Sequence, residues 1–280
     1  MFREIKGRIH APLVTMGPIE LRQPIPFNDL EQISPFLLLH HFDFMMKPGE
    51  NKFSVPAHPH RGFMPITFMY QGSVSHEDSL GNKQVINDNE VQWINAGRGI
   101  IHSETVGKEW VDRGGRFNGV QLWINLPKAD KMNTPYYQPL TTKDIVLIEK
   151  EGVSLRLVSG EHDGKKGPAH SDVFTAMMQM KSGSNYSFNF PSSNNVLVYI
   201  LEGEILVNDI IKASQHDLIY FEHEDGLIIL EASIDAALLI LSGEPLHEPL
   251  VSHGPFVMTS QTEILEAIKD YSQGKMGYLY

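Results

Sequence analysis

Short apolar runs separated by turn residues dominate the first half of the chain. Residues 66–70 and 117–126 are the longest runs, and both are rich in side chains that favour β-strands. Shorter runs lie at residues 74–77, 85–86, 91–94 and 100–104, and polar or glycine-containing turns follow at residues 80–83, 87–90 and 96–99. Strands of this length and spacing predict an antiparallel sandwich or small barrel rather than a βαβ sheet.

A second block with the same pattern follows a segment that contains several prolines. Residues 127–144 include Pro127, Pro135 and Pro139 and are expected to form a linker. The apolar runs of the second block are residues 153–158, 174–180, 196–202, 205–207, 217–221, 226–230 and 236–241. Residues 199–204 parallel residues 68–73, because in both an apolar run ends in a polar residue and then glycine. We therefore predict a weak internal repeat and two domains, residues 1–130 and residues 145–280.

The clearest helix predicted by the sequence lies near the end of the chain, at residues 260–271. Ser260 or Thr262 can cap its first turn. A single apolar face is predicted from the spacing of Ile264, Leu265, Ile268 and Tyr271. We expect this helix to end the second domain. If it also packs back on the first domain, deleting the second domain should unfold the first.

Composition excludes several functional classes. The 280 residues are 41% hydrophobic, enough for a large core, and a net charge of -11 leaves no basic cluster for direct binding of nucleic acid. There is no cysteine, which excludes disulfides, thiolate metal sites and cysteine nucleophiles. The N-terminus lacks the apolar core of a signal peptide and no apolar run reaches roughly 18 residues, so we expect no signal peptide, no membrane span and a cytoplasmic location.

Two pairs of metal-binding side chains occur in the first block. His58 and His60 are one residue apart, and so are His102 and Glu104. Alternate side chains of a strand point to the same face, so each pair can point into one cavity. If the two strands lie near each other, three imidazoles and one carboxylate can bind a single divalent transition metal ion. In the absence of thiolate, Fe(II) is favoured, with Mn, Ni, Co, Cu and Zn as alternatives. The competing interpretation is four polar residues on exposed strands.

Longer motifs around these residues resemble the pirin family of the cupin superfamily. The motifs are His58-Pro59-His60-Arg61-Gly62-Phe63 and residues 76–82, 92–104, 119–126, 242–246, 248–249 and 253–258. The resemblance covers nearly the whole chain and implies an all-β bicupin, with two tandem cupin barrels and a short C-terminal helix. It also implies that His58, His60, His102 and Glu104 bind the metal in the first barrel. The second barrel, which has no His-x-His pair, is expected to lack a metal site.

The resemblance implies two kinds of function, and the residues do not choose between them. Some pirins are metal-dependent dioxygenases that open the central ring of flavonols such as quercetin, a reaction in which Glu104 would be both ligand and candidate base. Other pirins are non-catalytic, redox-sensing regulators that bind a transcription factor or a metabolic enzyme. A protein that binds a small molecule without turnover is a third interpretation.

Three positions near the motifs depart from the family pattern. Pirins usually have glutamate and threonine where this chain has Met64 and Pro65, and they often have aspartate where it has His40. Met64 is expected to remove a polar group near the site, and Pro65 removes a backbone donor from its strand. We expect these changes to affect the reaction more than the binding of the metal.

Other polar residues near the motifs have two interpretations each. His76, Glu77 and Asp78 are interpreted as part of a solvated strand face rather than as catalytic residues. Gln121 can reach the ligand cavity as a hydrogen-bond donor. Arg98 either orients an anionic substrate or is only a turn residue that pairs with a surface acid.

Overall fold

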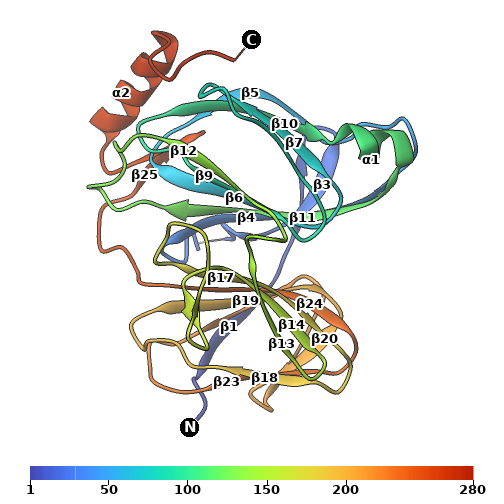
Figure 1. Cartoon of the computed structure of the whole chain (residues 1–280). Helices are drawn as coiled ribbons and strands as arrows, with labels where there is room; N and C mark the ends of the chain where they lie inside the picture. The colour runs from blue at the N-terminus through green and yellow to red at the C-terminus, as the bar shows by residue number, and fades with distance from the viewer. Residues whose placement is uncertain (29, 280) are drawn as a thin grey trace. The chain divides into compact units, whose positions relative to one another are not determined.

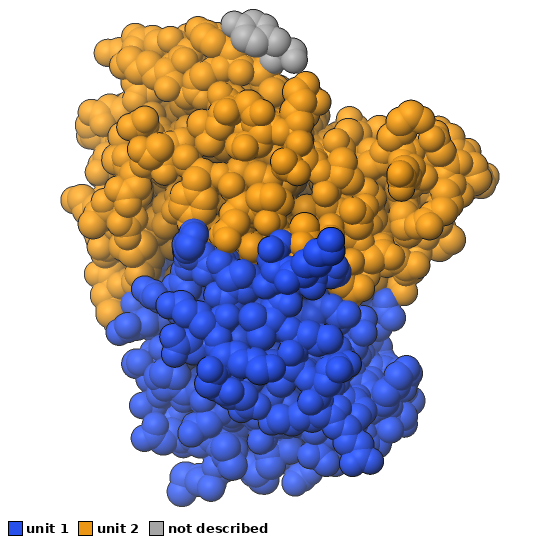
Figure 2. Space-filling view, viewed as in Figure 1, with its two compact units in different colours: residues 1–13, 22–34, 142–245 blue, residues 14–21, 35–141, 246–280 orange. Residues whose placement is uncertain are grey.

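Antiparallel strands account for most of the fold, as the sequence predicts. The structure is a computed structural model that describes residues 1–28 and 30–279. The chain divides into two units, shown in blue and orange in Figure 2. Unit 1 consists of Met1–Leu13, Arg22–Ser34 and Thr142–Pro245, and unit 2 consists of Val14–Leu21, Pro35–Thr141 and Leu246–Tyr280. The architecture is the predicted all-β fold of two tandem cupin barrels.

Unit 2 contains a four-stranded sheet and all of a seven-stranded sheet except Leu13 and residues 22–25 (Figure 1). The order of the larger sheet is β12 (Tyr136–Leu140), β9 (Val91–Asn95), β6 (Phe63–Gln71), β11 (Gly115–Asn125), β4 (Phe36–Met46), β3 (Ile19–Ile25) and β2 (Leu13–Met16). The order of the smaller sheet is β5 (Ser54–His60), β10 (Ile100–Val106), β7 (Val74–Asp78) and β8 (Lys83–Ile86). A hairpin of β25 (Val251–His253) and β26 (Phe256–Met258) also belongs to this unit, with the helices α1 (Lys108–Arg113) and α2 (Gln261–Ser272).

Every apolar run predicted in the first block falls on a strand of unit 2. The expected linker at residues 127–144 is wrong in part, because β12 lies within it and pairs with β9. Pro139 is tolerated there since β12 is an edge strand, whose outer donors need no partner. Helix α1 was not predicted. It is six residues long and buries only Trp110, so it leaves no helical period in the sequence.

Unit 1 repeats this arrangement of sheets (Figure 1). Its seven-stranded sheet has the order β1 (Ile5–His10), β22 (Asp217–Phe221), β19 (Asn195–Glu202), β24 (Ala236–Gly243), β17 (Phe174–Met180), β14 (Val153–Ser159) and β13 (Val146–Lys150). Its four-stranded sheet has the order β18 (Asn185–Phe188), β23 (Ile228–Ala232), β20 (Glu204–Val207) and β21 (Ile211–Ser214). A small hairpin joins β15 (Glu161–His162) and β16 (Lys165–Lys166).

The matching sheet orders confirm the internal repeat. Strand by strand, β6, β7 and β10 of unit 2 correspond to β19, β20 and β23 of unit 1. The glycines that revealed the repeat lie at equivalent turns, Gly72 between β6 and β7 and Gly203 between β19 and β20. Both have positive φ, 124° and 82°, which explains why glycine recurs at this turn.

The units differ from the expected domains, residues 1–130 and 145–280, at both ends of the chain. Strand β1, near the N-terminus, pairs with β22 and is the edge strand of unit 1. Helix α2, near the C-terminus, belongs to unit 2, where Ile264 and Ala267 pack in one cluster with Ile101 and Phe256. Both placements depend on contacts between residues far apart in sequence, which local patterns do not record.

Helix α2 begins as predicted but uses a narrower apolar face. Ser260 is its N-cap, and the Ser260 Oγ accepts a hydrogen bond from the backbone N–H of Glu263 at 3.3 Å. Of the predicted face, Ile264 is buried, whereas the exposed side chains include Leu265, Ile268 and Tyr271. In the part of the chain that the structure describes, no helix is long and apolar enough to cross a membrane.

Candidate metal centre

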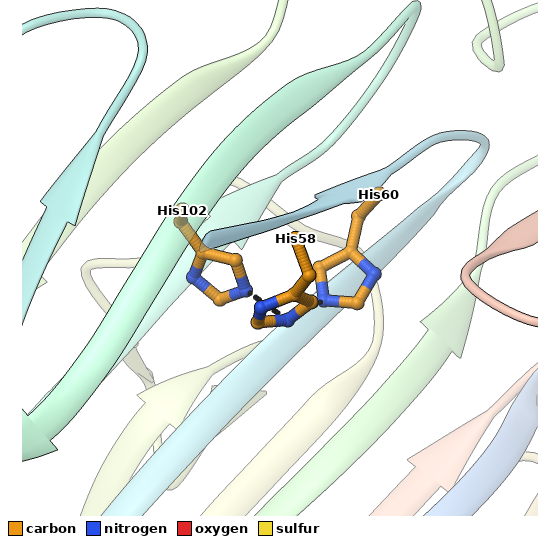
Figure 3. Close-up of side chains that lie close together, drawn as sticks. All are labelled: His58, His60 and His102. Carbon is orange, nitrogen blue, oxygen red and sulfur yellow. Dashed lines mark hydrogen bonds between the residues drawn. The ribbon is translucent and has the colours of Figure 1, made fainter. Parts of the chain in front are cut away.

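Three histidines from two neighbouring strands of unit 2 point toward one another (Figure 3). His58 and His60 lie on β5, and His102 lies on β10 directly opposite His58 in the antiparallel register. The Nε2 atom of His58 is 3.0 Å from Nε2 of His60 and 2.9 Å from Nε2 of His102. The alternation of side chains along β5 therefore brings both of its histidines to one point, as predicted.

The protonation of these histidines suits metal binding. Burial, followed by the neighbouring His58, holds the pKa of His60 well below its usual value, and burial with the three surrounding histidines does the same to the pKa of His102. Nδ1 of His58 lies 2.9 Å from the carbonyl oxygen of Pro56, which can only accept a hydrogen bond. In neutral His58 the proton is therefore on Nδ1, and Nε2 offers its lone pair to the centre of the cluster.

The spacing of the nitrogens fits a single ion. Two nitrogen ligands at about 2.1 Å from an ion, at right angles to each other, lie about 3.0 Å apart. That is the separation found between His58 and each of the other two histidines. Among the described residues, two groups of three have ligand atoms within 4.8 Å of one another, namely His58, His60, His102 and His76, His102, Glu104. His102 is common to both groups.

Glu104 is held beside the histidines by two amide groups. Its Oε1 accepts a hydrogen bond from Nε2 of Gln92 at 2.5 Å, and its Oε2 accepts one from Nε2 of Gln121 at 3.1 Å. The carboxylate is 2% exposed, and a shift in strand register lies between His102 and Glu104. Gln121 thus has the donor role expected from the sequence, whereas Gln92 was not predicted. Its signal was its place beside the Trp93 strand motif, two residues from the end of an otherwise apolar run.

The interpretation of His76 and Asp78 as a solvated strand face is wrong. His76 is 0% exposed and Asp78 is 2% exposed, whereas Glu77 between them points outward and pairs with Lys83. Nε2 of His76 lies 2.9 Å from Oδ2 of Asp78, and Nδ1 of His76 lies 3.4 Å from Nδ1 of His102. The alternation along β7 places His76 and Asp78 on one face of the strand whether that face is exposed or buried. The sequence alone does not show that this face points into the barrel.

A cavity of about 270 Å³ lies against the candidate ligands. Its lining includes His58, His60 and Glu104, and its apolar wall includes Leu21, Leu38, Phe42, Phe53, Val55 and Trp123. His40 also lines it, and burial lowers the pKa of His40 to about 4, so its imidazole is neutral. The cavity therefore has a largely apolar wall beside the carboxylate of Glu104. The wall residues come from four different strands and the segment before β5, so the sequence could not identify them as a group.

Met64 and Pro65, two of the departures from the family pattern, lie on opposite faces of β6. Met64 is opposite Ile124 in the β6–β11 register, whereas Pro65 is opposite Trp123 and Thr67 is opposite Gln121. Paired residues of neighbouring strands share a face, so Met64 points to the side of the sheet away from the cavity. The expectation that Met64 removes a polar group near the site is therefore wrong, and Pro65 is the substitution on the cavity face.

Arg98 is a turn residue whose side chain is exposed. Its backbone carbonyl accepts a hydrogen bond from Nε of Arg61 at 2.6 Å, and its backbone N–H donates to Asn133 at 2.9 Å. Arg98 is not among the residues that line the cavity described above. The geometry therefore favours the interpretation of Arg98 as a turn residue, whereas its pairing with a surface acid stays a prediction.

Comparisons with known proteins agree with this architecture. Residues 19–124 match the family model described as Pirin, and residues 175–277 match the one described as Pirin C-terminal cupin domain. A Pseudomonas aeruginosa protein provisionally named a quercetin 2,3-dioxygenase is 40% identical over 264 residues, which cover 91% of each chain. A crystal structure of quercetin 2,3-dioxygenase from Acinetobacter baumannii is 34% identical, covers 100% of both chains and has a TM-score of 0.93. The nickel(II) complex of the Escherichia coli pirin YhhW shares the fold at 20% identity and a TM-score of 0.68, over 86% of this chain and 99% of its own.

Proposed function

This chain belongs to the pirin family of the cupin superfamily, and on that premise we propose that it is a metal-dependent dioxygenase acting on a flavonol such as quercetin. The proposed metal ligands are His58, His60, His102 and Glu104. The proposed ion is a divalent transition metal, with Fe(II) favoured because the donor set contains imidazole and carboxylate but no thiolate. A small aromatic substrate is favoured by the relatives named for quercetin.

The observation that carries the proposal is the apolar cavity beside the three histidines. A regulator that only senses the redox state of its metal needs the ligands but no space for a substrate. This protein has a cavity of about 270 Å³, just below the range of roughly 300–1,000 Å³ usual for small-molecule pockets. Its wall of Phe42, Phe53 and Trp123 suits flat aromatic rings. We therefore place catalysis ahead of regulation.

The residues of the proposed site have different roles in the reaction. The apolar wall excludes water and orients the rings, while Gln92 and Gln121 fix the carboxylate of Glu104. Glu104 Oε2, which accepts from the cavity-lining Gln121, is the proposed acceptor of the proton of the flavonol hydroxyl. A bound divalent ion would supply Lewis acidity toward the substrate oxygens and redox chemistry toward dioxygen.

The test is incubation of protein loaded separately with Fe, Mn, Ni, Co or Cu with quercetin under air. We expect the flavonol absorbance to fall with at least one metal. Glu104→Gln should retain much of the metal through the three histidines but lose turnover, and His60→Ala should lose both. Absence of any absorbance change with all five metals would contradict the proposal. Capture of a protein partner that depends on the oxidation state of the metal would then favour the regulatory alternative.

A further inference from the structure

A buried carboxylate lies two hydrogen bonds away from the candidate metal centre. Oδ1 of Asp78 accepts hydrogen bonds from the backbone N–H groups of Leu80 at 2.9 Å and Asn82 at 3.1 Å. The side-chain amide of Asn82 donates to both oxygens, at 3.1 and 2.8 Å. Burial raises the pKa of Asp78, but the hydrogen bonds from His76 and Asn82 outweigh it and lower the pKa overall. All four of these hydrogen bonds come from N–H donors, so both oxygens of Asp78 act as acceptors.

His76 connects this carboxylate to His102. Its Nε2 is 2.9 Å from Asp78 Oδ2 and must donate, because the carboxylate has no proton to offer. Its ring is stacked on Tyr137, with 4.3 Å between centroids and 14° between planes, so it cannot tilt out of this plane without losing that contact. Its other nitrogen, Nδ1, faces Nδ1 of His102 at 3.4 Å. Each ring nitrogen of His76 thus has one fixed partner.

The direction of these hydrogen bonds decides which nitrogen of His102 is free. A metal at the cluster requires a lone pair on Nε2 of His102, the atom that faces His58. The proton of His102 must then be on Nδ1, where its facing atom is Nδ1 of His76. That atom can accept only if the proton of neutral His76 is on Nε2, where Asp78 receives it. These hydrogen bonds are therefore consistent with one tautomer of each histidine, with the proton on Nδ1 of His102 and on Nε2 of His76.

We propose that His76 and Asp78 are positioning residues that hold His102 in the tautomer able to bind the metal. They act through His102 and touch neither the proposed ion nor the substrate. Their role is the same as that of the Pro56 carbonyl for His58, but it is relayed through a second imidazole. The inference rests on the metal site of the proposed function and not on its reaction, so it holds even if quercetin is not the substrate.

The experiment compares four variants of the full chain. His76→Leu removes both hydrogen bonds of His76. Asp78→Asn allows an amide N–H to face His76 and to reverse the direction of the hydrogen bonds. His76→Gln keeps one acceptor and one donor on a side chain of similar reach, and should restore binding. Glu77→Gln is the matched control, because Glu77 lies on the same strand and points outward. The dissociation constant of Ni(II) is measured for each protein by competition with a chelator.

We expect His76→Leu and Asp78→Asn to bind Ni(II) roughly 10- to 100-fold more weakly, the effect usual for partners of metal-binding histidines. His76→Gln should recover most of the loss and Glu77→Gln should match the wild type. In the Co(II)-loaded wild type, the Nδ1–H of His102 should give a shifted, solvent-exchangeable proton resonance that is absent from His76→Leu.

Three outcomes separate the possibilities. If the wild type binds no metal, the proposed function fails along with its site. If the wild type binds and both His76→Leu and Asp78→Asn bind within twofold of it, this inference fails while the proposed function stands. If His76→Leu does not fold, the comparison of Asp78→Asn with His76→Gln decides, since equal affinities for those two would also overturn the inference.

Discussion

Replacement of Lys131 by methionine should destabilise unit 2 because it removes a buried amine that joins three segments. Lys131 is 2% exposed, and its Nζ donates to the carbonyl of Gly62 at 2.7 Å, to Oδ1 of Asn125 at 2.6 Å and to the carbonyl of Val257 at 3.1 Å. Gly62 follows His60 by two residues, so the hydrogen bonds of Lys131 support the end of the strand that carries two candidate ligands.

The magnitude follows from the three acceptors that Lys131→Met leaves behind. A buried acceptor that loses its donor costs roughly 1–3 kcal/mol, and part of this cost is relieved by small shifts of the backbone. The free energy of unfolding should therefore fall by about 3–5 kcal/mol, the range found when one partner of a buried charged group is removed. Lys128→Met is the control, because Lys128 is exposed on the same segment and its loss should change stability by roughly 0.5 kcal/mol or less.

The assay is urea unfolding of chelator-treated protein followed by tryptophan fluorescence. All three tryptophans, Trp93, Trp110 and Trp123, lie in unit 2, so the signal reports on the unit that contains Lys131. Removing metal first prevents its binding energy from adding to the measured stability. A loss below about 1 kcal/mol for Lys131→Met, or an equal loss for Lys128→Met, would refute the reasoning.

The same residue predicts a pH dependence with a definite sign. Burial lowers the pKa of Lys131 to about 8, against the opposing effects of Glu248 and Glu263. In the unfolded chain its pKa is near 10.5, so between pH 8 and 10.5 the unfolded state binds more protons than the folded state. Wild-type stability should therefore rise relative to Lys131→Met across this window, by about 3 kcal/mol at most. A difference between the two proteins that stays constant with pH would contradict the burial of a charged amine.

Three further predictions concern the ligands, the turn after them and the other unit. Metal content measured by elemental analysis should be lost on substitution by alanine of any one of His58, His60 and His102, and full retention in all three variants would overturn the ligand assignment. Gly62→Ala should destabilise unit 2 by roughly 1–3 kcal/mol and weaken metal binding, because Gly62 has φ of 87° and an added Cβ would collide with the carbonyl of Val257. Tryptophan fluorescence and chelator competition would show this. Leu230→Ala should reduce stability measured by circular dichroism by about 2–5 kcal/mol through the cavity it leaves, with metal content unchanged.

The candidate ligands could be predicted because their geometry is local. A strand places residues two apart on one face, and the pairs on β5 and β10 needed only to be neighbours in the sheet. The family resemblance supplied that second condition. His76 and Asp78 have the same spacing, but local alternation cannot tell which face of a strand points into a barrel. Their burial became visible only when β7 was placed beside β10.

Features set by long-range contacts were beyond local patterns. The edge strand β1 and the helix α2 each belong to the unit formed by the more distant part of the sequence. Met64 was assigned to the site from its position in a motif, but the register of β6 with β11 turns it away. The cavity wall likewise combines single residues from several strands, none of which differs in sequence from ordinary core.

The two barrels show that the site is specified by a few inward side chains and not by the fold. Strands β18 and β23 of unit 1 match β5 and β10, yet at the same alternating spacing they have Tyr186, Phe188, Ile228 and Leu230, all in one apolar cluster. Apolar side chains fill most of that interior, and the hydroxyl of Tyr186 lies 2.8 Å from Nε2 of His162. In unit 2, His58 has the backbone carbonyl of Pro56 as a polar partner, and His102 has the buried His76, which in turn has the buried Asp78. A ligand-bearing barrel therefore requires a second layer of polar residues, and that layer separates unit 2 from its repeat as clearly as the histidines do.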